Sequence, residues 1–286
     1  MKLSDVFEIA SGTITGFDHV ISSKNNQDGL AIYADDDQLI AAVCDGCSGS
    51  KKAEVGSNIA ARLIVNLLRD NHSLYYEDAR ALERLKDDFL IGLCNVAKEL
   101  DTNYRQVLIE YFQFTTVVMV LNRIQNKLWI FSIGDGAIAV NGEFVDLGPF
   151  PDNAPPYVVY NMLDTSLAQD NPELLDFRLN YELELDELQS AMIGSDGVID
   201  LVNISEHKMP GKQTLVGPLS QFWENDLFFR NRDALRRKLV LTSRESIKLD
   251  RSTTPFGLRK EPGLLPDDTT MFIIRRKKPS EEGEVT

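Results

Sequence analysis

The sequence predicts an α+β fold with mainly antiparallel strands, and three observations lead to that class. Short apolar runs rich in β-branched residues are separated by turn signals, of which Asn141-Gly142 is the strongest. Two long stretches, at residues 52–69 and 78–100, carry apolar residues at helical spacing. The strands follow one another instead of alternating with helices, which argues against a regular βαβ arrangement.

The first strands are expected near the N-terminus. Residues 7–17 mix alternating apolar residues with Gly and Thr, and a polar loop then leads to a second strand at 30–33. Three aspartates at 35–37 are typical of a solvated hairpin turn. The apolar run 39–44 suits a buried strand, and it stops at Asp45-Gly46.

The middle of the chain supplies two helices and then a meander of strands. The helices at 52–69 and 78–100 are expected to cover a sheet with their apolar faces. The strands that follow are predicted at 114–122, 127–133, 137–140 and 143–147. The second of these ends at Gly134-Asp135-Gly136, which is another strand that stops at an acidic turn.

The remaining third begins with a change of composition. Five prolines fall within 148–172, so we expect a mobile excursion there with one short strand at 157–163. Strands are predicted at 177–185, 190–194 and 271–274, and an amphipathic, basic helix over 222–248. Its arginines and lysine between 230 and 238 are interpreted as a solvated helix face, with a docking surface as the alternative. The polar tail 277–286 is expected to be disordered.

Composition narrows the class of protein. The chain has 286 residues and a formal net charge of −14, from 30 Lys and Arg against 44 Asp and Glu, which argues against nucleic acid or an anionic membrane as the main partner. No apolar stretch approaches the roughly 20 residues of a membrane helix, and no signal peptide is evident. Three cysteines, including Cys44 and Cys47, are too few for a disulfide framework or a zinc site. A cytoplasmic location is expected.

Four acidic turns stand beside strand ends, at Asp45-Gly46, Asp135-Gly136, Asp196-Gly197 and Asp267-Asp268. Asp28 is a fifth acid, in the N-terminal loop. A chain this acidic produces Asp-Gly turns by chance, so the spacing leaves two interpretations open. The acids are separate turns, or they share one carboxylate site.

The order of these motifs resembles one family. Asn25-Asn26-Gln27-Asp28, Asp45-Gly46, Gly134-Asp135-Gly136, Ser195-Asp196-Gly197 and Asp267-Asp268-Thr269-Thr270 follow the sequence of motifs in the PPM phosphatases, the metal-dependent protein phosphatase 2C family. The likeness spans roughly residues 10–275 and is greatest to the bacterial branch. It implies a single domain over 1–276, built as a four-layer α-β-β-α sandwich with two central antiparallel sheets. Residues 148–172 would form a flap beside the active site.

The resemblance also implies a site and a mechanism. Asp45 would bridge two metal ions, and Gly46 would lend its backbone carbonyl. Asp196 and Asp267 would complete the ligands of the first ion, Asp28 would hold bound waters, and Asp135 with Asp196 would hold a weaker third ion. Asp45, Asp196 and Asp267 are thus the expected catalytic residues. Oxygen ligands suit Mg²⁺ or Mn²⁺, and the bridging hydroxide would attack phosphorus in line.

The chain departs from the family pattern at three places. Gln27 stands where many members have Glu, and Cys47 stands where eukaryotic members have a histidine regarded as the general acid. The phosphate-binding arginine expected upstream is missing, so Lys24 and then His19 are the candidate substrate-binding residues. The alternatives are a solvated Lys24 and a packed or exposed His19 ring.

The favoured function is therefore a metal-dependent protein serine/threonine phosphatase that takes a phosphoprotein substrate, with a Ser/Thr kinase as a possible counterpart. The alternative is a weak or inactive PPM-like module that binds a phosphoprotein or a regulatory partner. The first is favoured because all four core aspartates are retained.

Overall fold

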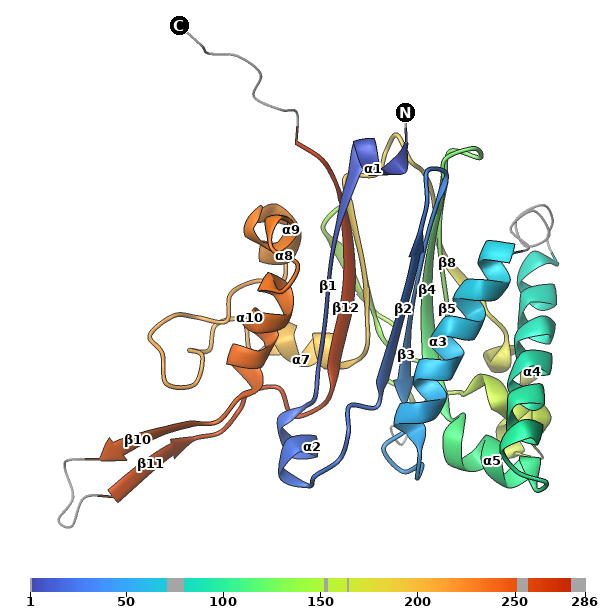
Figure 1. Ribbon diagram of the computed structural model, residues 1–286, viewed down its shortest axis with the longest axis horizontal. Coiled ribbons are helices and arrows are strands. Elements are labelled where there is room, and N and C mark those ends of the chain that lie inside the picture. Colours follow the sequence, from blue (N-terminus) through green and yellow to red (C-terminus); the bar gives the residue numbers. More distant parts are fainter. Residues whose placement is uncertain (1, 71–79, 152–153, 164, 251–256, 279–286) are drawn as a thin grey trace, which may run out of the picture.

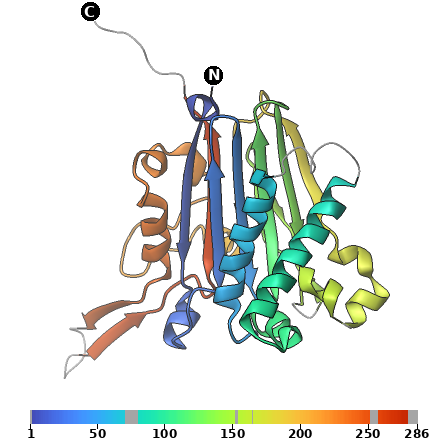
Figure 2. The ribbon, with the colours of Figure 1, turned by 45° about the vertical axis from the view of Figure 1, so that its right-hand side comes forward.

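The computed structural model describes residues 2–70, 80–151, 154–163, 165–250 and 257–278. Two antiparallel sheets pack face to face, and helices cover both outer faces (Figures 1 and 2). This arrangement confirms the predicted α+β sandwich of four layers. Of the predicted tail, residues 279–286 lie outside the described residues, as do the first residues of the helix expected from residue 78.

Each sheet has five strands among the described residues. The first has the order β1 (Phe7–Ile14), β12 (Thr269–Arg276), β9 (Ser190–Gly194), β6 (Ala137–Val140) and β7 (Glu143–Asp146). The second has the order β2 (Asp28–Ala34), β3 (Gln38–Gly46), β4 (Phe114–Asn122), β5 (Lys127–Ile133) and β8 (Arg178–Glu184). Neighbouring strands pair antiparallel throughout.

The helices are divided between the two outer faces. The second sheet is covered by α3 (Ala53–Asp70) and α4 (Ala81–Leu100), with α5 (Tyr104–Tyr111) below them (Figure 1). The first sheet is covered by α7 (Gly197–Asn203), α8 (Gln221–Glu224), α9 (Leu227–Arg230) and α10 (Ala234–Ser243). Short elements complete the chain: α1 (Leu3–Val6), α2 (Phe17–Ile21), η3 (Val158–Met162), α6 (Ser166–Asp170) and η4 (Pro172–Leu175).

Strand β3 shows why its sequence is apolar without interruption. Leu39, Ala41 and Val43 belong to the cluster between the two sheets. The alternate residues Ile40, Ala42 and Cys44 belong to the cluster beneath α3 and α4. Because successive side chains of a strand point to opposite faces, a strand covered on both sides must be apolar at every position.

The antiparallel pairing brings the predicted acidic turns to one end of the sandwich. Asp28, which begins β2, lies opposite Asp45 near the end of β3. Gly194, which ends β9, lies opposite both Met271 near the start of β12 and Ala137 at the start of β6. Strand ends and strand starts therefore meet, although their residues are far apart in the sequence.

The strand predicted at 157–163 is wrong, since Val158–Met162 is a 3₁₀ helix. Tyr157, Val158 and Val159 are all buried in the cluster beneath α4, whereas a strand would direct neighbouring side chains to opposite faces. An apolar run this short does not distinguish the two by itself.

The continuous helix predicted over 222–248 is also wrong. It is divided into α8, α9 and α10, followed by a hairpin of β10 (Ser246–Asp250) and β11 (Gly257–Glu261) that projects from the body (Figure 1). The breaks coincide with Asn225 and Asn231, whose side-chain oxygens accept hydrogen bonds from the backbone N–H groups two residues later. Asparagine competes with helix continuation in this way. The strand expected at 7–17 ends at Ile14, and the hairpin, α5 and α7 have no counterpart in the prediction.

None of the helices in the described part of the chain combines the length and the hydropathy that crossing a bilayer requires.

Candidate metal centre

Two acids of the second sheet meet at its end. Asp45 and Asp28 are direct cross-strand neighbours on β3 and β2, where Asp45 is half-buried and Asp28 is 5% exposed. Gly46 follows closely packed, and its N–H donates to the Gln27 carbonyl at 3.2 Å. A Cβ on Gly46 would lie 2.8 Å from both the Ala53 Cβ and the Gln27 oxygen, so a larger residue would push the turn apart.

Three more acids arrive from the first sheet and from the connection between the sheets. Asp196 follows β9, Asp267 precedes β12, and Asp135 lies between β5 and β6. These three, with Asp45 and Gly46, line one cavity of about 110 Å³. The rest of its lining is Cys47, Ser48, Thr115, Pro155 and Tyr157. The structure thus brings five of the six predicted metal ligands to one cavity, and the sixth, Asp28, is the cross-strand neighbour of Asp45.

Burial and mutual repulsion raise the pKa values of Asp45, Asp28 and Asp196. The pKa of Asp45 is raised well above its usual value, first by burial and then by the charges of Asp28 and Asp196. Burial and then Asp268 raise the pKa of Asp28 to about 8. Burial, then Asp135 and Asp267, raise the pKa of Asp196 to about 6. No lysine or arginine is among the described residues that line the cavity.

Among the acids of this group, two carboxylate oxygens are buried without a hydrogen-bond partner among the described residues. They are Oδ1 of Asp28 and Oδ1 of Asp196. A buried carboxylate oxygen without a donor is costly unless a cation is bound. Clustered carboxylates and a backbone carbonyl are the oxygen ligands that Mg²⁺ and Mn²⁺ prefer. The residues present therefore fit the divalent cations that the sequence predicts.

Asp28 is held in place by the other sheet. Its Oδ2 accepts a hydrogen bond from Ser195 Oγ at 2.8 Å, and Ser195 Oγ accepts one from the Thr270 N–H at 3.0 Å. Ser195 and Thr270 belong to motifs seen in the sequence, but sequence reasoning gave them no role. This chain of contacts joins β2 to β9 and β12 beside the cavity.

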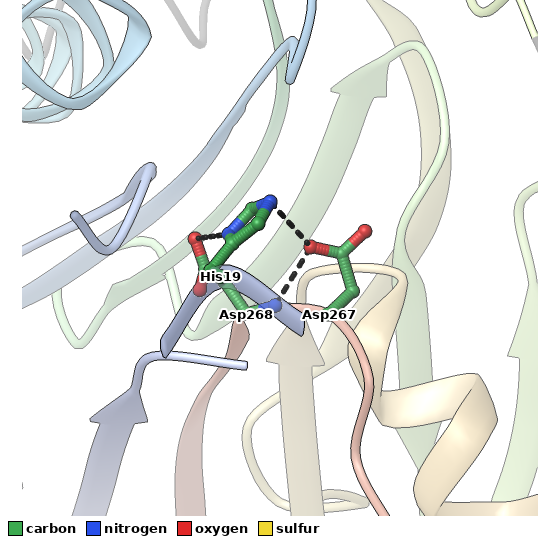
Figure 3. A group of neighbouring side chains, drawn as sticks. All are labelled: His19, Asp267 and Asp268. Atoms are coloured by element: carbon green, nitrogen blue, oxygen red, sulfur yellow. Dashed lines mark hydrogen bonds and ion pairs between the residues drawn. The ribbon is translucent and has the colours of Figure 1, made fainter. Parts of the chain in front are cut away.

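The neighbouring acids Asp267 and Asp268 have different surroundings (Figure 3). Asp268 is 2% exposed and accepts hydrogen bonds from the Gly16 N–H at 2.7 Å and the Gln27 N–H at 2.5 Å. Asp267 is exposed and accepts one from the Asp268 N–H at 2.8 Å. Asp268 is thus a structural anchor, whereas Asp267 remains accessible from the cavity.

His19, on α2, lies between these two acids (Figure 3). Its Nδ1 is 3.0 Å from Asp268 Oδ2, without the alignment of a hydrogen bond, and its Nε2 is 3.8 Å from Asp267 Oδ1. The ring is buried, as in the packed alternative. These three residues form the group among the described residues whose ligand atoms converge within 4.8 Å.

Lys24 lies at the rim of an adjoining cavity of about 600 Å³, which is also lined by His19, Asp196 and Asp267. Its Nζ donates to the Ser48 carbonyl at 3.2 Å, and its side chain is exposed. Asp200 lines the same cavity and escaped sequence reasoning. Its position one helical turn after Asp196 is the feature of the sequence that could have identified it. Burial and then Asp196 raise the pKa of Asp200.

The family model for protein phosphatase 2C matches residues 15–226. This chain belongs to the protein phosphatase 2C family. The matched span includes Asp28, Asp45, Asp135 and Asp196, while Asp267 lies beyond it.

Several solved structures of phosphatases are similar to this one over most of the chain. A bacterial serine phosphatase is 16% identical with a TM-score of 0.55, over 96% of this chain and 99% of that chain. Stp1 from Staphylococcus aureus, a serine/threonine phosphatase, is 18% identical over 98% of each chain with a TM-score of 0.49. The catalytic domain of the phosphatase PstP, solved with two manganese ions, is 15% identical over 96% of this chain and 99% of that chain, with a TM-score of 0.48. A comparison with curated proteins gave no match.

Proposed function

We propose that this chain is a metal-dependent protein serine/threonine phosphatase. The observation that carries the proposal is the convergence of aspartates from both sheets on one cavity, with buried oxygens that lack a partner. Family membership supports the same function. The cytoplasm is the proposed location and a phosphoprotein is the proposed substrate.

In this proposal Asp45, the Gly46 carbonyl, Asp196 and Asp267 would hold two Mg²⁺ or Mn²⁺ ions. Asp135 would contribute to a third, and Asp28 would orient bound water. Such ions would neutralise the phosphate and lower the pKa of water. The residues of the chain keep the site rigid, since Ser195 fixes Asp28 and Asp268 fixes the turn that carries Asp267.

The substrate phosphate would be met by Lys24. Its side chain is exposed at the rim and keeps one weak backbone contact. His19 is the weaker candidate, because its ring nitrogens face Asp267 and Asp268. The segment 148–172 would influence substrate choice, because Pro155 and Tyr157 line the wall of the cavity.

The test is hydrolysis of p-nitrophenyl phosphate and of a phosphothreonine peptide with Mn²⁺, with Mg²⁺ and with EDTA, together with the melting temperature. We expect turnover that requires the metal and a melting temperature that rises with Mn²⁺, because a ligand that binds only the native state stabilises it. Stabilisation without turnover would favour a module that binds a partner. The neutral Gln27, which stands where many family members have Glu, also favours that alternative. The absence of both effects would contradict the proposed metal site.

A further inference from the structure

Helix α2 stands between two cavities. Asp18, His19 and Ser22 line the cavity beside the candidate metal centre. Phe17, Val20 and Ile21 line a different cavity. A five-residue helix therefore has one face toward the candidate site, where His19 approaches Asp267 and Asp268 (Figure 3), and another face toward a second cavity.

We name this second cavity the α2 pocket, and its volume is about 540 Å³. Its lining comes from the end of β1, from α2 and from α10 with the residues that follow it: Ile14, Thr15, Phe17, Val20, Ile21, Arg236, Val240, Ser243, Arg244 and Glu245. Val20 is 61% exposed and Ile21 is 66% exposed. Two large aliphatic side chains in water beside a cavity are typical of a binding surface.

The charged residues that line the α2 pocket are two arginines and one acid. Arg236 and Arg244 form no ion pair with any residue in the described ranges. By contrast, Arg230 and Arg237 nearby pair with Asp226 and Asp233, at 3.4 and 3.5 Å. Two unpaired arginines around an apolar floor, in a protein of net charge −14, favour a ligand with carboxylates. Glu245 is the one acid among the residues that line the pocket.

A second exposed apolar surface lies on the β10–β11 hairpin, which starts directly after Glu245 of the pocket lining. Ile247, Leu249 and Leu258 are each more than half exposed. Leu249 and Leu258 are direct cross-strand neighbours, and Ile247 lies two residues from Leu249, so all three share one face. Lys248 points to the other face, where its Cε lies near Gly211. Lys260, opposite Ile247, adds a further cation to the apolar face.

We propose that the α2 pocket and this hairpin face dock a segment of a partner protein that carries large apolar side chains flanked by carboxylates. Apolar anchors would enter between Val20, Ile21 and Val240, and the carboxylates would meet Arg236 and Arg244. A bound segment restrains α2. It thereby also restrains His19, which belongs to α2, and the turn at Asp267, which His19 approaches. An effect of this restraint on phosphatase turnover rests on the proposed function, whereas the docking itself does not.

The docking is tested by panning a random dodecapeptide library displayed on phage against the whole chain. We expect the enriched peptides to be acidic with one or two large apolar residues. Synthetic copies should bind the variant Arg236→Glu/Arg244→Glu at least roughly tenfold more weakly, which corresponds to about 1.4 kcal/mol. The matched control is Arg230→Glu/Arg237→Glu, which has the same net charge and should bind like the wild type.

A second variant, Val20→Ser/Ile21→Ser, tests the apolar contribution and should also weaken binding, because both side chains are exposed and their loss leaves the core intact. Basic or neutral enriched peptides, or peptides that bind all variants equally, would overturn the proposal. A dimer in solution that Arg236→Glu/Arg244→Glu dissociates would assign the surface to a second copy of the chain and would also overturn it.

The link between the α2 pocket and the candidate metal centre is tested without an activity assay. The imidazole NMR signals of the protein are compared with and without peptide. We expect the His19 signal, assigned with His19→Gln, to shift on binding while that of His207 stays in place. Binding with an unmoved His19 signal would overturn the link through α2. Because neither measurement uses turnover, failure here and failure of the proposed phosphatase activity remain distinguishable.

Discussion

Asp28 and Asp268 are buried and Asp196 is half-buried, but the hydrogen bonding of their carboxylate oxygens differs. The carboxylate of Asp268 receives two backbone N–H groups and faces His19. Asp28 and Asp196 each keep a buried oxygen without a partner among the described residues. Backbone N–H donors therefore satisfy the carboxylate of Asp268, whereas Asp28 and Asp196 each keep an oxygen that can coordinate a cation.

Replacing Asp45 with Asn should abolish metal-dependent turnover, because this carboxylate borders the cavity from the centre of the acidic group. The fold should be kept, since burial and then four neighbouring acids raise the pKa of Asp45, and a neutral amide removes both the buried charge and the repulsion. Turnover and the melting temperature in EDTA are measured side by side. Asp87→Asn, at an exposed position on α4, is the control. Full Mn²⁺-dependent activity in Asp45→Asn would refute the metal assignment.

Without metal, the protein should lose stability as the pH rises from about 4 to about 8. The pKa of Asp28 is raised to about 8, so the folded state keeps a proton that the unfolded state releases near its ordinary value of 3.8. The folded state then binds more protons, and the free energy of unfolding falls with pH across this window. Melting temperatures in EDTA at pH 5 and pH 8 test this. Asp28→Asn should flatten the dependence, and an unchanged slope would contradict the cause.

At the scale of elements, close backbone approaches fix how the helices sit on the second sheet. Helices α3 and α5 meet at Gly56, where a Cβ would lie 1.5 Å from the Tyr111 carbonyl oxygen. The same region connects to the site, since the Cys47 N–H donates to the Gln113 carbonyl just after α5. The position of α5 thus supports the turn that follows Asp45.

Replacing Gly56 with Ala should therefore destabilise the protein by at least about 2 kcal/mol, as overpacking at rigid backbone does. Urea denaturation of the metal-free protein gives the free energy of unfolding. Gly49→Ala is the comparison, because its added Cβ meets nothing closer than 3.6 Å. Equal stabilities of the two variants would show that α3 can move away from α5 without cost.

At the scale of the molecule, Arg275 joins the first sheet to its helical layer. It is 5% exposed at the end of β12. Its guanidinium donates to Glu8 at 2.8 Å, to Asp226 at 2.9 Å and to two carbonyls of α8, and it lies 3.9 Å from the centre of the Phe229 ring. One side chain thus contacts β1, α8 and α9.

Arg275→Leu should cost roughly 3 kcal/mol of stability, because it removes the buried guanidinium that pairs with Glu8 and Asp226 and leaves two carbonyls of α8 without that donor. Chemical denaturation provides the value. Arg237→Leu, which breaks an exposed pair with Asp233, should change it by less than about 0.5 kcal/mol. A loss at Arg275 no larger than that of the control would mean that the layer is held by its apolar contacts alone.

The strands that lie in the core could be predicted, and so could the acids that end them. Runs such as 39–44 and 117–121 are apolar at every position because both faces are covered, and that pattern is visible in the sequence. Elements outside the two central sheets were harder to predict. The segment 157–163 has a strand-like composition, and burial beneath α4 decides its 3₁₀ form. The asparagines that divide 222–248 act through local hydrogen bonds, which periodicity does not register.

By itself, the sequence determined that apolar strands stop at acidic turns, that these turns follow a family order, and that no lysine or arginine stands inside the motifs. Only the tertiary structure decided which acids remain unpaired, that Asp268 is an anchor, and that α2 separates two cavities. The physical reason is that side-chain pattern is local and repeats along the chain. Burial and hydrogen bonding depend on partners that antiparallel pairing brings together from distant parts of the chain, 252 residues apart for Gly16 and Asp268 and 267 residues apart for Glu8 and Arg275.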